Sequence, residues 1–451
     1  MNRLWRGLRG FLVALALVFG LRTASGQAAA PITLDEAIAG ARAHHPRMAE
    51  AQAAEEQAQS ARRAAASGRL PVIAASEEAV YSDDPVFAFG SKLRQGRFAS
   101  SDFDLNTLNH PAALSNFDAS VNVSWTAFDG GATRSKVASA NSSLWAAVLE
   151  TQYAGEQVAE SVTTLYYRVL MAEEQIAVAN AALQRAQEIA ADVEDRVHAG
   201  LALESDGARA RLALQDAQND AAAAHEHVQL ARTDFFDLIG EPNSDQPLVR
   251  PEVKALPSGD AAASDALAQR FDLQALRMEQ QSARQQLTSI KASAWPAISA
   301  YGHVENDSEH LATGGSGNWA VGAKIELSVF DSGLRRAREQ EAAANLHRLA
   351  AQERSTLLEA NANIAALKAL MVDLHRRLTT AESAVRVEQD ALQTTRDRYA
   401  SGLVSITEVL SGESQLTAAE FQRVRLFYQL CMAKADLALA DGQQATSKAG
   451  Q

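Results

Sequence analysis

The side chains that could carry chemistry in this chain are mainly paired histidines and acids close to glycine turns. His44-His45 and His225–His227 have spacings of one and two, whereas residues that share a helical face are three or four apart. We interpret these histidines as solvated, so no metal and no cofactor is expected. The sequence contains no nucleophile elbow, phosphate-binding loop or metalloprotease helix motif, so the chain is not expected to be an enzyme.

Two acids follow sharp reversals of the chain. Asp206 comes after Gly200-Leu201, and Glu408 comes after Gly402-Leu403. Glycine readily adopts the left-handed conformation that ends a helix, and an apolar residue usually follows it. Ser405–Glu408 then fits a capping box for the next helix. The pattern predicts two tight helix reversals.

The helices that lead to these reversals are predicted to be very long. Segments 132–199 and 334–401 lack proline, and Gly155 is their only glycine. At 1.5 Å per residue each helix would be roughly 100 Å long. Such rods need parallel neighbours, as in a coiled coil. Shorter helices, two of which match one rod in length, are expected at 33–67, 206–240, 265–294 and 407–439.

Four strands are predicted at the other end of these rods. Segments 117–127 and 319–329 alternate apolar and polar residues over eleven positions, and less regular strands are expected at 70–82 and 295–306. A tilted transmembrane strand needs about 9–11 residues, with one lipid-facing and one lumen-facing side. A half-buried strand of a soluble protein has the same pattern.

Comparison of the chain with itself indicates an internal duplication. Segment 116–131 matches 318–333 at an offset of 202, whereas upstream matches have an offset of 225. The 23-residue difference lies in segment 85–115, which we interpret as a surface loop. The expected organisation is a first repeat at 27–240, a proline-containing linker at 241–264, a second repeat at 265–440 and a polar tail at 441–451.

Residues 1–26 have the features of a secretory signal peptide. Arginines precede the apolar run Phe11–Leu21, and small residues at 24–26 favour cleavage before Gln27. An uncleaved anchor is the alternative, although eleven apolar residues fall short of the roughly 20 that span a bilayer. Cleavage would remove four arginines and no acid, so the net charge would change from −13 to −17. This charge argues against a nucleic-acid partner.

The predicted sheet is too small to exist alone in a membrane. Four strands cannot close a barrel, and unpaired edges are not tolerated in lipid. Further copies of the chain must complete it, and three copies would supply twelve strands. The rival class is a secreted structural or adhesive coiled coil, which would suit the long helices but not the duplication and the matched strands.

Several short motifs occur in order along the chain. They are ITLDEA at 32–37, His45-Pro46, RFDL at 270–273, and the strand-to-helix corners WTAFDGG at 125–131 and LSVFDSG at 327–333. Together they resemble the TolC family of outer-membrane efflux proteins, over nearly all of residues 27–441.

The resemblance implies a mostly α protein with membrane β-structure. It implies a homotrimer, whose twelve-stranded barrel in outer-membrane lipid continues into a twelve-helix tunnel in the periplasm. It also implies that a periplasmic adaptor and an inner-membrane transporter, such as an RND pump, use the trimer as a passive exit duct for efflux. The outlet of a type I protein secretion system would look the same, so the cargo stays open.

The resemblance also implies a periplasmic gate, at Asp206, Tyr399 and Glu408. Two positions depart from the family pattern, because Val404 replaces a gate arginine and Ser411 replaces an aspartate of the narrowest ring. In a threefold assembly Asp206 and Glu408 would gather, and repulsion between the carboxylates would make the aperture sensitive to pH. Alternatively, both acids only stabilise helix N-termini.

The four residues at the helix reversals are the contact with the adaptor that the resemblance implies. They are Gly200, Leu201, Gly402 and Leu403, and each also serves the turn itself.

Overall fold

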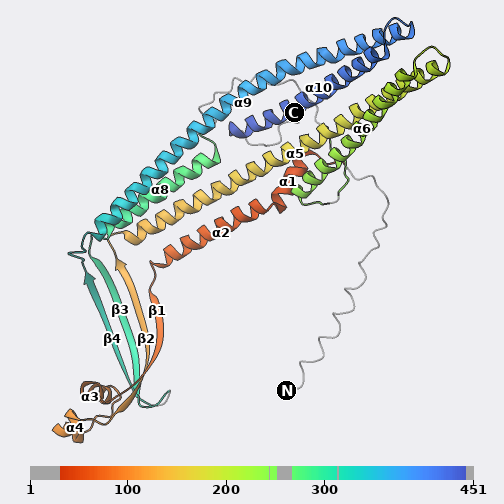
Figure 1. The fold of residues 1–451 in the computed structure, drawn as a ribbon. Coiled ribbons are helices and arrows are strands. Elements are labelled where there is room, and N and C mark those ends of the chain that lie inside the picture. Colours follow the sequence, from red (N-terminus) through yellow and green to blue (C-terminus); the bar gives the residue numbers. More distant parts are fainter. Residues whose placement is uncertain (1–30, 243, 251–266, 312–313, 443–451) are drawn as a thin grey trace, which may run out of the picture.

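The computed structural model describes residues 31–242, 244–250, 267–311 and 314–442. The expected signal peptide lies outside these residues, as do most of the expected linker and tail. Figure 1 shows a sheet at one end of an elongated molecule and two helical hairpins at the other. Among the described helices, none has a stretch apolar enough and long enough to cross a membrane.

The sheet has four antiparallel strands in the order β1-β2-β3-β4. In chain order they span Val72–Ser82, Leu114–Phe128, Ala297–Ser308 and Ser316–Glu326. In the described residues β1 and β4 each pair on one side only.

One face of the sheet is apolar and the other is polar. Val121 pairs with Val304, which in turn pairs with Trp319, so these side chains share a face. On the opposite face Ser120 pairs with Glu305, which pairs with Asn318. The alternation expected from the sequence is therefore present in three dimensions.

All four strands differ from their expected bounds by one to three residues at one end or both, and the second and fourth differ most. The fourth strand was expected at 319–329, but β4 covers 316–326. Residues 327–333 instead turn towards the next helix, where the Asp331 carboxylate accepts hydrogen bonds from the backbone N–H groups of Gly333 and Arg335, both at 3.1 Å. Strand β2 begins at Leu114, inside the segment interpreted as a loop.

The loop interpretation of segment 85–115 was wrong in detail, because short helices occupy it. They are α3 (Pro85–Arg94), the 3-10 helix η1 (Ser100–Phe103) and α4 (Leu105–Asn109). Phe98 packs edge-to-face on both Phe89 and Phe103, with centroids 4.8 and 5.1 Å apart. These helices lie at the far end of the sheet (Figure 1).

Two helices of 67 residues each, α5 (Ala132–His198) and α9 (Leu334–Ala400), run from the sheet to the hairpin tips. Both begin after a left-handed glycine, Gly131 or Gly333. At the first corner the Asp129 carboxylate accepts from Gly131 N–H and Thr133 N–H, at 3.1 and 2.7 Å. This arrangement parallels that of Asp331 at the second corner.

The helix expected at 33–67 is divided into α1 (Leu34–His44) and α2 (Pro46–Ser67). The break follows from Pro46, which has no N–H and disfavours a helical conformation at the preceding residue, and His45 is accordingly extended. The remaining long helices in the described part of the chain are α6 (Glu204–Ile239), α8 (Phe271–Ala292) and α10 (Ile406–Ala440). The segment expected to start at 265 becomes helix α8 only at Phe271, and residues 251–266 lie outside the described part.

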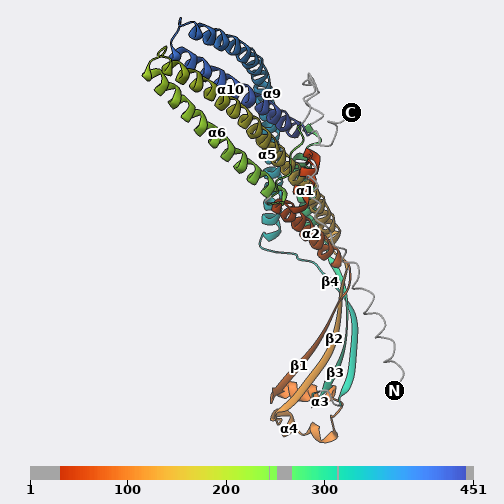
Figure 2. The same cartoon turned by 90° about the vertical axis from the view of Figure 1, so that its right-hand side faces the viewer.

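The largest apolar core lies where α1, α5, α6 and α10 meet. At its centre Tyr166 is 1% exposed, and its hydroxyl donates to the carbonyls of Ile32 and Val249, at 3.1 and 2.5 Å. Ile32 also forms a parallel bridge with Leu248. Figure 2 shows that the helices α5, α6, α9 and α10 continue well beyond helix α1, which forms part of this core.

Candidate functional site

The first hairpin consists of α5 and α6, the second of α9 and α10, and closely similar reversals form their tips. Gly200 and Gly402 are left-handed, with φ of 72° and 74°. Leu201 N–H donates to Arg196 O at 2.8 Å, and Leu403 N–H donates to Arg398 O at 2.9 Å. This is the Schellman pattern, which explains why glycine followed by leucine ends each helix.

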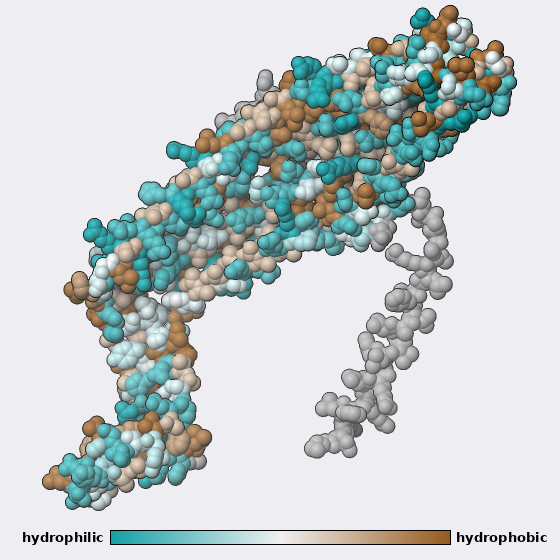
Figure 3. Space-filling view, viewed as in Figure 1, coloured by the Kyte–Doolittle hydropathy of each residue, from teal (hydrophilic) through white to brown (hydrophobic). Residues whose placement is uncertain are grey.

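The leucines of both tips point into solvent. Leu201 is 78% exposed and Leu403 is 69% exposed. In Figure 3 apolar residues gather at the hairpin end, whereas polar residues cover much of the visible helical surface. The tips thus present apolar side chains to solvent at the end of the helical rod.

The two expected gate acids differ in their roles. Asp206 lies in the first turn of α6, and its carboxylate accepts a hydrogen bond from the backbone N–H of the N-cap residue Leu203 at 3.4 Å, as the acid at the third position of a capping box does. The capping box expected at Ser405–Glu408 is absent, because the Ser405 side chain makes no capping hydrogen bond. Glu408 is exposed in the first turn of α10.

Tyr399 lies where α9 meets the first hairpin. The guanidinium of Arg196 lies 5.1 Å from the centroid of its ring. Partial burial raises the pKa of Tyr399; the Arg196 charge opposes this shift and the Asp206 charge adds to it. Within the described residues its hydroxyl has no hydrogen-bond partner. Tyr399 therefore lies near Arg196 and Asp206, whereas among the described residues no hydrogen bond or ion pair joins it to Glu408.

Two arginines of the first hairpin, Arg196 and Arg209, donate hydrogen bonds to the second hairpin. Arg196 Nη1 donates to Ala400 O at 3.4 Å, and Arg209 Nη1 donates to Thr407 Oγ1 at 2.6 Å. Both contacts are exposed. Neither arginine was singled out from the sequence, because nothing local marks its partner on the other hairpin.

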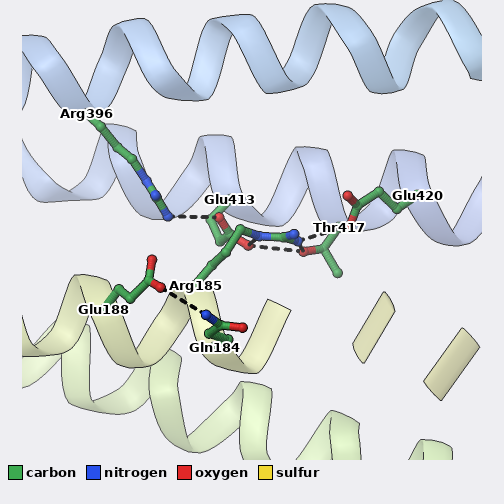
Figure 4. A network of polar contacts seen from close by, with 7 residues as sticks. All are labelled: Gln184, Arg185, Glu188, Arg396, Glu413, Thr417 and Glu420. Carbon is green, nitrogen blue, oxygen red and sulfur yellow. Dashed lines mark hydrogen bonds and ion pairs between the residues drawn. The ribbon is translucent and has the colours of Figure 1, made fainter. Parts of the chain in front are cut away.

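A third arginine, Arg185 of α5, makes a more buried link between the hairpins (Figure 4). Its Nε lies 2.5 Å from Glu413 Oε1, and its Nη2 lies 3.0 Å from Glu420 Oε2 and 3.2 Å from Thr417 Oγ1. Burial lowers the pKa of Arg185, but the hydrogen bonds and charges of the two glutamates outweigh it, so the pKa lies above its ordinary value. Arg185 therefore remains charged.

The comparison with known families identifies the chain. Residues 37–241 and 262–443 match the family described as outer membrane efflux protein. One curated relative is the probable outer membrane lipoprotein SilC of Salmonella typhimurium, which is 26% identical over 59% of this chain and 59% of its own length.

Solved structures show the same fold. VceC of Vibrio cholerae has a TM-score of 0.76 at 23% identity, over 91% of this chain and 96% of its own. The open state of the MtrE outer membrane channel of Neisseria gonorrhoeae has a TM-score of 0.75 at 21% identity, over 91% and 88%. The family match, which covers most of the sequence, confirms the resemblance to TolC-type proteins and the expected outer-membrane location. The chain therefore belongs to the outer membrane efflux protein family.

Proposed function

We propose that three copies of this chain form an exit duct through the outer membrane. The observation that carries the proposal is the four-stranded sheet, whose outer strands β1 and β4 each pair on one side only in the described residues. Unpaired edges are unfavourable in lipid, so neighbouring copies would pair β4 of one with β1 of the next. Three sheets of four strands then close one barrel of twelve.

The two faces of the sheet support this assembly. Val121, Val304 and Trp319 share the apolar face, which would contact lipid. Ser120, Glu305 and Asn318 share the polar face, which would line a water-filled lumen. The duct would thus conduct polar cargo passively.

The helices would continue the barrel into a periplasmic tunnel. Helices α5 and α9 have the same length and begin at similar glycine corners, which supports the proposed duplication into repeats at 27–240 and 265–440. The helices of three copies would enclose the tunnel. The signal peptide at 1–26 would direct the chain to the periplasm.

We infer that the hairpin tips form the periplasmic gate of the duct and the surface to which a periplasmic adaptor binds. Asp206, Tyr399 and Glu408 would control the aperture, although Val404 and Ser411 remove two of the family's gate groups. Gly200, Leu201, Gly402 and Leu403 would meet a periplasmic adaptor, which their exposed leucines would suit. The adaptor would connect the duct to an inner-membrane transporter such as an RND pump.

The assembly can be tested with the purified full-length protein. It should require detergent for extraction, have the mass of a trimer and conduct ions in a planar lipid bilayer. A stable, water-soluble monomer would contradict the proposal.

The gate can be tested in the same bilayers. Asp206→Asn combined with Glu408→Gln should change the conductance of the closed state and its response to pH. An unchanged conductance and pH response would show that these acids serve only the helix N-termini.

A further inference from the structure

The segment that makes the first repeat longer than the second forms a separate group of short helices. Helices α3, η1 and α4 occupy residues 85–109, which we call the outer insert. Figure 1 shows the outer insert at the end of the sheet that lies farthest from the helical hairpins. Its contacts with the sheet decide which of the two faces it covers.

A chain of buried polar groups joins the outer insert to the sheet. Gln95 Nε2 donates to Asn116 Oδ1, and Asn116 Nδ2 donates to Asp307 Oδ1, both at 2.7 Å. The three residues are 4%, 7% and 0% exposed. Along their strands Asn116 shares a face with Ser120, and Asp307 shares a face with Glu305, because side chains alternate between the two faces. The outer insert is therefore attached to the polar face of the sheet.

Two further contacts lie on the same face. Arg94 Nη1 lies 3.9 Å from Glu305 Oε1, and the Glu305 side chain is only 15% exposed. A Cβ atom on the left-handed Gly96 would lie 3.5 Å from Cβ of Ser316, which pairs with Asp307. Farther along the polar face, Asn122 is exposed. The outer insert thus covers only the far end of this face.

The outer insert also has internal contacts that give it a defined shape. Asp84 Oδ1 accepts a hydrogen bond from Phe87 N–H at 2.8 Å and so caps α3. Lys92 Nζ lies 2.8 Å from Asp102 Oδ1, and Asp102 Oδ2 accepts from Ala99 N–H at 2.8 Å. Together with the packed phenylalanines described above, these contacts make the insert a folded body.

The position of the outer insert has a direct consequence in the proposed duct. If the polar face lines the lumen, a body that covers this face lies inside the barrel. A helix with its side chains is about 10 Å thick, so each insert would move the wall inwards by about that distance. Between β3 and β4, the described residues of the second repeat contain no helix. A trimer would therefore have three inserts around its mouth.

We propose that the three outer inserts form a fixed narrowing at the extracellular mouth of the duct, and that this narrowing sets the size of the largest molecule that can pass. The proposal rests on the duct function proposed above. It assigns size selection to residues 85–109, which the buried contacts of Gln95 and Asn116 hold over the lumen.

The test asks which thiol reagents reach the polar face from outside intact cells. Cys431→Ser removes the single native cysteine of the full-length protein, and Asn122→Cys then adds a thiol on the polar face beyond the insert. A small maleimide is compared with a maleimide that carries a long polyethylene glycol chain. Val121→Cys, on the adjacent residue, is the matched control on the apolar face.

The outer insert can be removed without separating the strands that flank it. Ser82 and Leu114 lie directly opposite each other in β1 and β2, so a short glycine-rich turn can replace residues 83–113. A milder variant, Gln95→Ala, breaks the buried polar chain. Ser101→Ala is its control, because Ser101 is exposed in the same insert and its side chain makes no hydrogen bond within the described residues.

The narrowing predicts labelling that depends on reagent size. The small maleimide should label Asn122→Cys in every form, whereas the large one should react only slowly until the insert is replaced. Gln95→Ala should speed the large reagent about tenfold, as loss of a buried hydrogen-bond partner implies. Ser101→Ala should leave the rate unchanged, and neither reagent should label Val121→Cys.

Two results would overturn different parts of this picture. If the large reagent labels Asn122→Cys equally fast with and without the insert, the insert lies clear of the lumen and the narrowing is wrong. If even the small reagent fails to label Asn122→Cys after the insert is replaced, the polar face lines no open lumen and the duct function itself is wrong. Detergent-stable trimers on a gel check assembly, and Gln95→Ala decides the test if the replaced form does not assemble.

Discussion

Helices α5 and α9 have the same length but different surroundings. Nineteen residues of α5 are buried in the protomer, and α5 contacts α1, α2, α6, α8 and α10. Only seven residues of α9 are buried, and apolar side chains such as Leu358 and Val372 are 65% and 73% exposed. Helix α5 is thus the axis of the protomer, whereas α9 has a face that further copies would cover. In the proposed trimer, the first repeat would therefore supply the buried axis of each protomer, and the second repeat would supply an exposed face for contact between copies.

The largest expected effect is in the core around α5. Tyr166→Ala removes a fully buried ring and two hydrogen bonds, so the free energy of unfolding should fall by about 3–5 kcal/mol. Denaturant titration of the purified protein measures this. Gln152→Ala, at an exposed position of the same helix, should change it by less than about 0.5 kcal/mol. If both variants lowered the free energy of unfolding equally, the buried side of α5 would contribute no more to stability than its exposed side.

A substitution on α9 should act on assembly instead. Val372→Asp places a carboxylate on the exposed apolar face, so the helical content of the protomer should stay unchanged. Each subunit contact of the proposed trimer should weaken by about 1–3 kcal/mol, because the carboxylate would have to lose water at that contact. Native mass spectrometry in detergent would detect the loss of trimer. A trimer as stable as the wild type would mean that this face meets no other copy.

The corner that begins α5 should show a smaller, pH-dependent effect. Burial raises the pKa of Asp129, but hydrogen bonds from Thr133 and from backbone N–H groups outweigh it, so the pKa lies below its ordinary value. A lowered folded pKa stabilises the fold above the ordinary value of about 3.9, and the stabilisation is lost as pH falls through the folded pKa.

Asp129→Ala should therefore cost about 1 kcal/mol near neutral pH and less in acid. Denaturant midpoints of wild type and variant, measured from neutral pH downwards, should converge at low pH. A constant difference would exclude titration of Asp129 as the cause.

The smallest effect is expected at the tips. Arg209→Ala removes one exposed hydrogen bond to Thr407, so stability should change by no more than about 0.5–1 kcal/mol. Thermal unfolding would measure it, with Arg211→Ala, which removes an exposed ion pair with Glu194 inside the first hairpin, as the comparison. A loss as large as that caused by Tyr166→Ala would show that the tip contacts carry far more of the fold than their exposure suggests.

Features with a local chemical cause could be predicted from the sequence. Gly200 and Gly402 end their helices because the left-handed turn favours glycine, and the alternating segments form strands with one apolar face. The break at Pro46 also has a local cause and was overlooked, because the alanine-rich pattern continues on both sides.

Features that depend on distant partners could not be predicted in the same way. The helices at 85–109 are held by contacts such as that of Gln95 with Asn116, which a loop pattern does not reveal. Arg185 needs glutamates more than 200 residues away. The position of Arg185 among apolar residues of the helix indicates that it needs an acidic partner, but only the fold shows which residues these partners are.

The bridge between Ile32 and Leu248 has a consequence for the chain as a whole. It brings the two ends of the first half side by side, where Tyr166 binds both. Non-covalent contacts within residues 32–249 hold the two ends of this segment together. The peptide bond that continues into the second half is therefore not needed to keep those ends in place. If the chain is divided after residue 250 and each polypeptide carries the signal peptide of residues 1–26, the two fragments should associate and rebuild the folded molecule, which co-purification would detect.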